Sequence, residues 1–203
     1  DIAQNRGPLV IETTDGSFLE ADVVPPSLGM ISMSSSSTAG VIGVGQQLTV
    51  RFVASEPLGL DSTIAIAGDT NVSLVCDATR IVCTGTYTVS ADSPEGPAAM
   101  SITIVDVAGN PGMGDFTGIT RGSLLPIDTT FPTASLITIA SDGANSTLAT
   151  VGSLISLELR YSEPVHVPNV QLLGRAAQVE CTVDECTASV VVTQADPGGL
   201  ITF

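Results

Sequence analysis

Four cysteines are the first side chains in this sequence whose type and spacing could do chemistry. Cys76 and Cys83 enclose six residues, and Cys181 and Cys186 enclose four. Each pair could close a hairpin as a disulfide or supply half of a zinc site. Zinc needs four ligands per site, and the single histidine, His166, is not repeated. We therefore predict two local disulfides, which indicate an oxidising compartment.

Acidic side chains and one asparagine could gather around a calcium ion where extracellular repeats join. The candidates are Glu56, Asp92, Asp106, Asn110 and Asp128, with Glu163 and Asp196 as the counterparts of Glu56 and Asp92. Alternatively, Asp106 and Asn110 cap a tight turn through side-chain-to-backbone hydrogen bonds, and Glu56 precedes a proline in a bend. No D-x-D-x-D-G loop is present. We therefore favour the turn interpretation and expect no cofactor, with calcium at the repeat junctions as the alternative.

A catalytic constellation is not recognisable. His166 lies in SEPVHVP, and no G-x-S-x-G elbow offers it a nucleophile, so we expect a solvent-facing loop histidine. The glycine-rich GVIGVG (40–45) is followed by the strand-like LTVRF, whereas a phosphate-binding loop would open a helix. We interpret it as a turn and expect no enzymatic activity.

Two N-x-S/T triplets, at Asn71 and Asn145, could accept N-linked glycans. They fall at different points of the internal repeat described next, so they are not part of its fold. Such triplets also arise by chance, and their occupancy requires a eukaryotic secretory route.

The elements that must position these residues are repeated along the chain with a period of about 106 residues. The landmarks recur in one order: Asp1 with Asp106, Asp22 with Asp128, VGQQLTVRFVASEPL (44–58) with VGSLISLELRYSEPV (151–165), the two cysteine pairs, and ADSPEG (91–96) with ADPGG (195–199). This pattern predicts that residues 1–21 are the last strand of a preceding repeat and that 22–127 are a complete repeat. Residues 128–203 are predicted to be a repeat that lacks its last strand.

Within a repeat the apolar residues alternate with polar ones. Leu48, Val50 and Phe52 alternate with Thr49 and Arg51, which is the period of a strand with one buried face. Further strands are predicted at 62–67, 74–76, 84–89, 99–105 and 116–125, separated by turn-forming residues. About seven short strands in one repeat predict an all-β fold of tandem antiparallel β-sandwiches, of immunoglobulin type with Greek-key connections.

The stretch ITIVDVAGN…PIDTTFPT (102–133) carries a resemblance to known repeats. It resembles the end of one repeat and the start of the next in extracellular immunoglobulin-like arrays, such as hyalin-type repeats and the repeats of large bacterial and algal surface proteins. VGSLISLELRYSEPV looks like the second strand of such modules. The chain departs from antibody domains, because it has no Trp and its cysteines are local. The resemblance implies a class of extracellular module.

The charge and composition narrow the function further. A net charge of −15 makes nucleic acid a poor partner, and no apolar run is long enough to insert into a membrane. Lysine is absent, which excludes Schiff-base chemistry and Lys–Asn isopeptide bonds. Aromatic residues form 3% of the chain, whereas sugar-binding faces and protein hot spots usually rely on Trp and Tyr.

We therefore expect an extracellular or cell-surface protein that acts as a rigid spacer in a filament, stalk or surface fibre, for example a mastigoneme-like flagellar hair. The alternatives are an adhesin module that binds glycan or protein through its loops, and an accessory module of a secreted enzyme. The expected partners are neighbouring repeats or identical subunits arranged head to tail. A strand from residues 7–20 is expected to complete an incomplete sandwich equivalent to 128–203, by strand addition.

Overall fold

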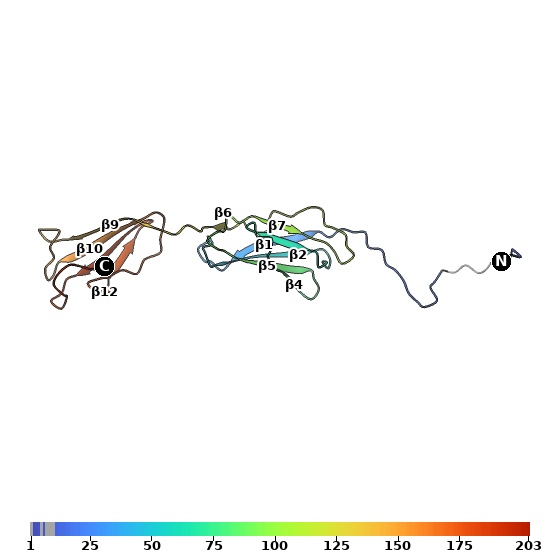
Figure 1. Ribbon diagram of the computed structural model, residues 1–203, viewed down its shortest axis with the longest axis horizontal. Coiled ribbons are helices and arrows are strands. Elements are labelled where there is room, and N and C mark those ends of the chain that lie inside the picture. The colour runs from blue at the N-terminus through green and yellow to red at the C-terminus, as the bar shows by residue number, and fades with distance from the viewer. Residues whose placement is uncertain (1, 5, 7–10) are drawn as a thin grey trace. The chain divides into compact units, whose positions relative to one another are not determined.

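The computed structural model describes residues 2–4, 6 and 11–203, and among these it contains strands and loops without a helix (Figure 1). The chain divides into two compact units, Asp1–Thr129 (unit 1) and Thr130–Phe203 (unit 2). The landmark Asp1 and the first part of the expected 7–20 strand, residues 7–10, lie outside the described residues.

Unit 1 is built on a four-stranded antiparallel sheet. Its second strand has the predicted alternation, because Leu48, Val50 and Phe52 are fully buried while Arg51 is exposed. A strand whose side chains alternate between core and solvent shows this period of two in its sequence. The strands lie in the order β1 (Leu28–Ser35), β2 (Gln47–Ala54), β5 (Val82–Thr88) and β4 (Leu74–Cys76).

Two shorter ladders complete unit 1. Ile64 and Ile66 of one ladder strand and Met100 and Ile102 of its partner belong to the same buried core as the four-stranded sheet. These ladders are β3 (Thr63–Ile66) with β7 (Met100–Thr103), and β6 (Gly96–Pro97) with β8 (Pro126–Ile127). The core of unit 1 therefore takes side chains from the main sheet and from these ladders.

The strand predicted over residues 116–125 is wrong as a regular strand. Phe116 and Arg121 form isolated bridges, to Ile102 and Ser32, and the residues between them are irregular. Gly122 has a φ of 97°, which regular strands do not contain. This segment nevertheless covers part of the core, so its apolar residues were a correct sign of burial.

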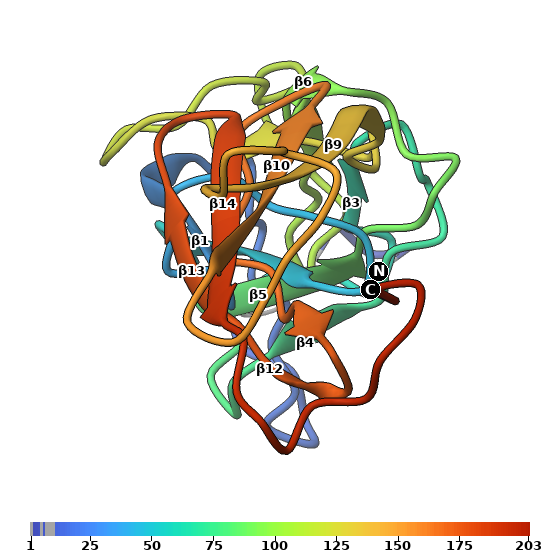
Figure 2. The same ribbon diagram turned by 90° about the vertical axis from the view of Figure 1, so that its left-hand side faces the viewer.

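Unit 2 contains a second four-stranded antiparallel sheet, and Figure 2 shows three of its strands, β13, β14 and β10, side by side. Its buried residues include Ile155, Leu157 and Leu159, the counterparts of the alternating residues in β2. The strands lie in the order β13 (Gln178–Cys181), β14 (Glu185–Val191), β10 (Leu154–Tyr161) and β9 (Ala134–Ser141), and a short hairpin joins β11 (Gln171–Leu172) to β12 (Arg175–Ala176).

The two main sheets match in register and in their connections. Phe52 pairs with Ile31 on one side and Cys83 on the other, and its counterpart Leu159 pairs with Ile137 and Cys186. The hydrogen bonds that lead into the first strand also recur, because Ser55 N donates to Ser27 O at 2.9 Å and Ser162 N donates to Thr133 O at 2.9 Å. The internal repeat seen in the sequence is thus a repeat of the sheet.

The units differ in what covers their first strand. Ile31 of β1 is 2% exposed, whereas its counterpart Ile137 of β9 is 48% exposed. In unit 1, Thr120 N and Arg121 N both donate to Ile31 O, at 2.9 and 3.1 Å, and Ile31 N donates to Thr120 Oγ1 at 2.8 Å. The described part of unit 2 has no corresponding segment on β9.

Over the described residues the fold is therefore all-β, with several open antiparallel sheets. This arrangement is compatible with β-sandwiches.

Candidate functional site

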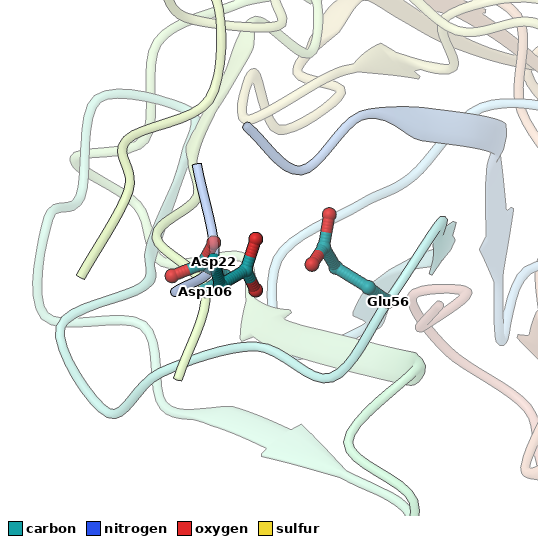
Figure 3. A group of neighbouring side chains, drawn as sticks. All are labelled: Asp22, Glu56 and Asp106. Atoms are coloured by element: carbon teal, nitrogen blue, oxygen red, sulfur yellow. The ribbon is translucent and has the colours of Figure 1, made fainter. Parts of the chain in front are cut away.

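The structure brings three carboxylates together in unit 1 (Figure 3). One carboxylate oxygen from each of Asp22, Glu56 and Asp106 lies within 4.8 Å of the others. Asp22 belongs to the segment that leads into β1, Glu56 follows β2 in a bend, and Asp106 opens a turn after β7. The cluster therefore joins residues from the beginning, middle and end of the repeat.

The turn at Asp106 positions this carboxylate. Asp106 is 2% exposed, and its Oδ1 accepts a hydrogen bond from Asn110 N at 2.8 Å. Its Oδ2 accepts another from Asn110 Nδ2, also at 2.8 Å, and Gly109, with a φ of 96°, reverses the chain between them. These bonds agree with the turn-capping role predicted from the sequence. Asn110 Nδ2 also donates to Asp22 O at 3.2 Å, so the turn holds the segment that leads into β1.

The carboxylates of the cluster differ in how they titrate. Burial raises the pKa of Glu56, and the negative charges of Asp22 and Asp106 raise it further. Burial also raises the pKa of Asp106, but hydrogen bonds from the Asn110 side chain and from backbone N–H groups outweigh this effect and leave the pKa below its usual value. Asp106 is therefore held ionised, while the ionised form of Glu56 is disfavoured by its neighbours.

A divalent cation would offset this repulsion. Two oxygens that share a calcium ion lie at most about 5 Å apart, because each calcium–oxygen bond is about 2.3–2.6 Å long. The spacing of Asp22, Glu56 and Asp106 satisfies that limit. Both oxygens of Asp106 already accept hydrogen bonds from Asn110, however, so the same group is explained by the turn.

The predicted ligands are only partly brought together. Glu56, Asp106 and Asn110 meet, whereas Asp92 is exposed and outside the cluster. Asp128 is half-buried in the segment that leads to unit 2, where its N–H donates to Ile42 O at 3.0 Å. The sequence-based list missed Asp22. The available signal was the repeat itself, because Asp22 is the counterpart of Asp128.

Unit 2 contains the counterpart of Glu56, and one of its carboxylate oxygens is not satisfied. Glu163 is half-buried, and its Oε1 is buried without a hydrogen-bond partner among the described residues. A carboxylate oxygen in this position costs free energy unless something else reaches it.

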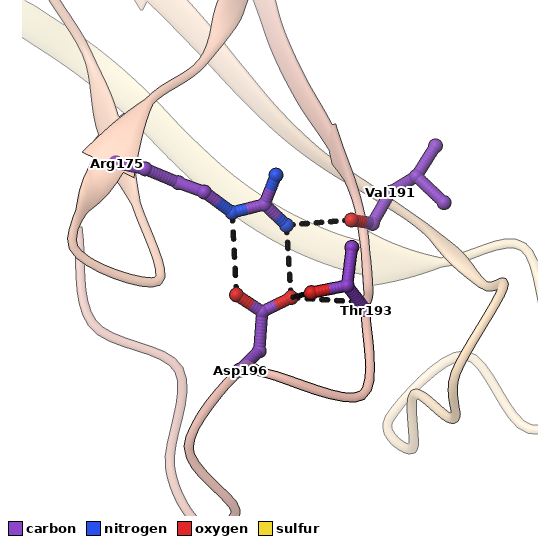
Figure 4. Close-up of polar contacts among 4 residues, drawn as sticks. All are labelled: Arg175, Val191, Thr193 and Asp196. Atoms are coloured by element: carbon purple, nitrogen blue, oxygen red, sulfur yellow. Dashed lines mark hydrogen bonds and ion pairs between the residues drawn. The ribbon is translucent and has the colours of Figure 1, made fainter.

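Asp196, predicted from the sequence to be the counterpart of Asp92, has a different role (Figure 4). Arg175 Nε and Nη2 donate to its two carboxylate oxygens at 3.2 and 2.9 Å, and Thr193 N donates to Oδ2 at 2.7 Å. The backbone hydrogen bond from Thr193 and the contact with Arg175 lower the pKa of Asp196. Ser93 makes the matching turn contact in unit 1, so the sequence alignment of Asp196 with Asp92 was displaced by one position.

Both predicted disulfides are present. Cys76 and Cys83 face each other across β4 and β5, and Cys181 and Cys186 face each other across β13 and β14. The bonds occupy corresponding places in the two sheets and account for all four cysteines. They suggest an oxidising environment of extracellular type.

The remaining sequence candidates lie at the surface. Asn71 and Asn145 are exposed, and Asn145 Oδ1 accepts a hydrogen bond from Thr147 N at 3.0 Å, within its own triplet. His166 is exposed in a loop. The glycine-rich stretch 40–45 is a turn, in which Gly45 N donates to Val89 O at 2.8 Å.

Comparisons with known proteins give this chain no relative, because no protein family, curated protein or solved structure matches it. A helix long and apolar enough to cross a membrane is not found among the described residues.

Proposed function

We propose that this chain is a structural repeat unit of a long extracellular filament, stalk or surface fibre, in which immunoglobulin-like sandwiches act as rigid spacers. The observation that carries this proposal is the repetition of one four-stranded sheet, with the same pairing of Ile31–Phe52–Cys83 and Ile137–Leu159–Cys186. Arrays of equivalent modules set length and spacing, because each module adds the same increment.

The contacts inside unit 1 support a load-bearing module. The turn that ends at Asn110 holds the backbone of Asp22, so the segment that leads into the module is bonded to residues near its end. The Cys76–Cys83 disulfide joins two neighbouring strands. Neither feature requires a ligand, and both restrict how the module opens.

The composition favours a spacer over a protein that recognises a ligand. Trp is absent and the chain has two Tyr, so the side chains that usually dominate protein and sugar recognition are scarce. The net charge of −15 keeps copies soluble and resists non-specific association.

The proposal is tested by measuring how tightly the distance between the two units is fixed. A spin label placed at exposed Ser73 in unit 1 and another at exposed Ala144 in unit 2 would report that distance by pulsed electron paramagnetic resonance. A rigid spacer gives a narrow distribution. A distribution as broad as that of a flexible linker would contradict the proposal, and binding to a panel of glycans would favour an adhesin instead.

A further inference from the structure

Residues 120–127 close unit 1 along the outer edge of β1. Thr120 and Arg121 hydrogen-bond to Ile31, as described above, and Ser32 and Arg121 form a parallel bridge. Further along, Leu125 N contacts Met33 Sδ at 3.4 Å, and Leu125 packs against the core. This segment therefore covers the outer edge of β1, where Ile31 is buried.

The same segment also closes the far end of unit 1. Pro126 O accepts a hydrogen bond from Ile42 N at 2.9 Å, and Ile127 forms a parallel bridge with Ile42. On its other side, Leu125 O accepts from Ala98 N at 2.9 Å, and Pro126 and Ile127 pair with β6. Residues 125–127 thus lie between the strand-like residues around Ile42 and those around Ala98.

Unit 2 has an open cavity at the corresponding place. Its volume is about 260 Å³, and its lining includes Ile139, Ala149, Ile155, Leu200 and Ile201. The register and the repeat make these residues the counterparts of those that contact or flank 125–127 in unit 1, which are Met33, Ile42, Leu48, Pro97 and Ala98. The cavity therefore lies where the repeat would place a segment like 125–127, and β9 beside it is an exposed sheet edge.

A second copy of the covering sequence exists within this chain. Residues 14–22 read TDGSFLEAD and residues 120–128 read TRGSLLPID, with Thr, Gly, Ser, Leu and Asp identical at the same spacing. Gly16 and Gly122 both have positive φ, 73° and 97°. Phe18 is 86% exposed and Leu19 is fully exposed, so this segment presents apolar side chains to solvent.

We propose that residues 14–21 of one copy of this chain dock on unit 2 of a second copy, as residues 120–127 do within unit 1. Thr14 then hydrogen-bonds to Ile137, the counterpart of Ile31. Leu19, the counterpart of Leu125, enters the cavity beside Ile139, while Glu20 pairs with Leu200 and Ala21 with Gly199, as Pro126 pairs with Pro97 and Ile127 with Gly96. The docked strand removes both an unpaired sheet edge and an apolar cavity from solvent.

This inference rests on the proposed function, because it states how successive spacers join. The contact is heterologous, since the donor segment and the acceptor face are different surfaces of the chain. Each copy has one donor and one acceptor, so repeated docking builds a head-to-tail chain of subunits.

The test uses the full chain and two charge substitutions at exposed positions. Leu19→Arg disables the donor, and Ile139→Arg, on the uncovered face of β9, disables the acceptor. Leu60→Arg, at a position in unit 1 that is 87% exposed, is the matched control. Sedimentation velocity is measured over a range of concentrations, at physiological and at higher ionic strength, because two chains of charge −15 repel each other.

Wild type and Leu60→Arg are expected to form a concentration-dependent series of oligomers, whereas each disabled variant alone stays monomeric. An equimolar mixture of Leu19→Arg and Ile139→Arg is expected to form a dimer and nothing larger, because one variant keeps its acceptor and the other its donor. This mixture also shows that both variants are folded. In that dimer, the β9 amides of the Leu19→Arg copy, whose acceptor face is occupied, should exchange with solvent at least tenfold more slowly than in the monomer.

A wild-type chain that stays monomeric at all concentrations, or a mixture that forms no dimer, would overturn the docking proposal. The exposed edge of β9 would then have to be covered by a segment of another sequence. Sedimentation tests the docking between copies, whereas the spin-label distances test the rigidity within one chain. Failure of the docking proposal is therefore distinguishable from failure of the spacer proposal.

Discussion

Matched substitutions in the two units would measure how much less well β9 is covered than β1. Ile31 and Ile137 occupy the same register position, but only Ile31 is buried, so Ile31→Ala and Ile137→Ala remove the same atoms from different surroundings. A buried isoleucine replaced by alanine typically lowers the free energy of unfolding by about 2–5 kcal/mol, because a cavity is left behind.

The expected loss at Ile137 is smaller for two reasons. About half of its side chain is already in solvent, so roughly half of the ~1.5–3 kcal/mol for burying such a side chain is at stake. Solvent also fills the space that is vacated, so no cavity term is added. We therefore expect Ile137→Ala to lower the stability of unit 2 by about 1 kcal/mol.

Native-state hydrogen exchange read by mass spectrometry assigns each loss to its unit, through peptides from β2 and β10. The measurement is made at low protein concentration, where copies do not associate, with Leu60→Ala as a surface control. Equal losses at Ile31 and Ile137 would refute the reasoning, because they would mean that β9 is as well covered as β1.

Three other outcomes follow from the structure. Replacing Cys76 and Cys83 together by serine should lower the free energy of unfolding by about 2–2.5 kcal/mol, as measured by denaturant titration, because the short loop they close gains freedom only in the unfolded chain. Gly112→Ala should cost about 1–3 kcal/mol, seen as a lower Tm, because its Cβ would lie 2.6 Å from a buried isoleucine side chain; Gly118→Ala, where the Cβ meets nothing within 4 Å, should be neutral. Glu56→Gln should raise the Tm at neutral pH but not at a pH below 4.5, the ordinary pKa of this group, because a raised pKa stabilises the fold only while the carboxyl is protonated; no gain at neutral pH would contradict the repulsion that raises the pKa of Glu56.

The regular sheets could be predicted from the sequence because they are half-buried. In β2 and β10 one face meets the core and the other meets solvent. Apolar and polar residues therefore alternate along the sequence, as at Leu48, Val50 and Phe52 of β2. The disulfides were predictable for a similar reason, since the two members of each pair are close in sequence and face each other on adjacent strands.

Contacts between distant residues were only partly predictable. The repeat pointed to Glu56 and Asp106, but no local pattern shows that the segment before β1 folds back far enough to bring Asp22 beside them. The segment 116–125 looked like a strand because its apolar residues pack, partly buried, against the core, although glycine conformations break its pairing. In both cases tertiary contacts, rather than local preference, decide the outcome.

The direction of pairing at the outer edge of β1 determines how unit 1 would respond to tension. The chain enters the unit before β1 and leaves it after Ile127, and both of the bridges that tie these two ends, Ser32 to Arg121 and Ile42 to Ile127, are parallel. A pull on the two ends therefore slides these segments past each other and loads their hydrogen bonds together in shear, rather than peeling them apart one by one. The disulfide between Cys76 and Cys83 locks only a short loop, so once the sheared bonds fail, about 100 residues can extend at roughly 3.3–3.6 Å each. Unit 1 would thus resist tension through the hydrogen bonds between its two ends, and its unfolding would release roughly 300 Å of additional chain length.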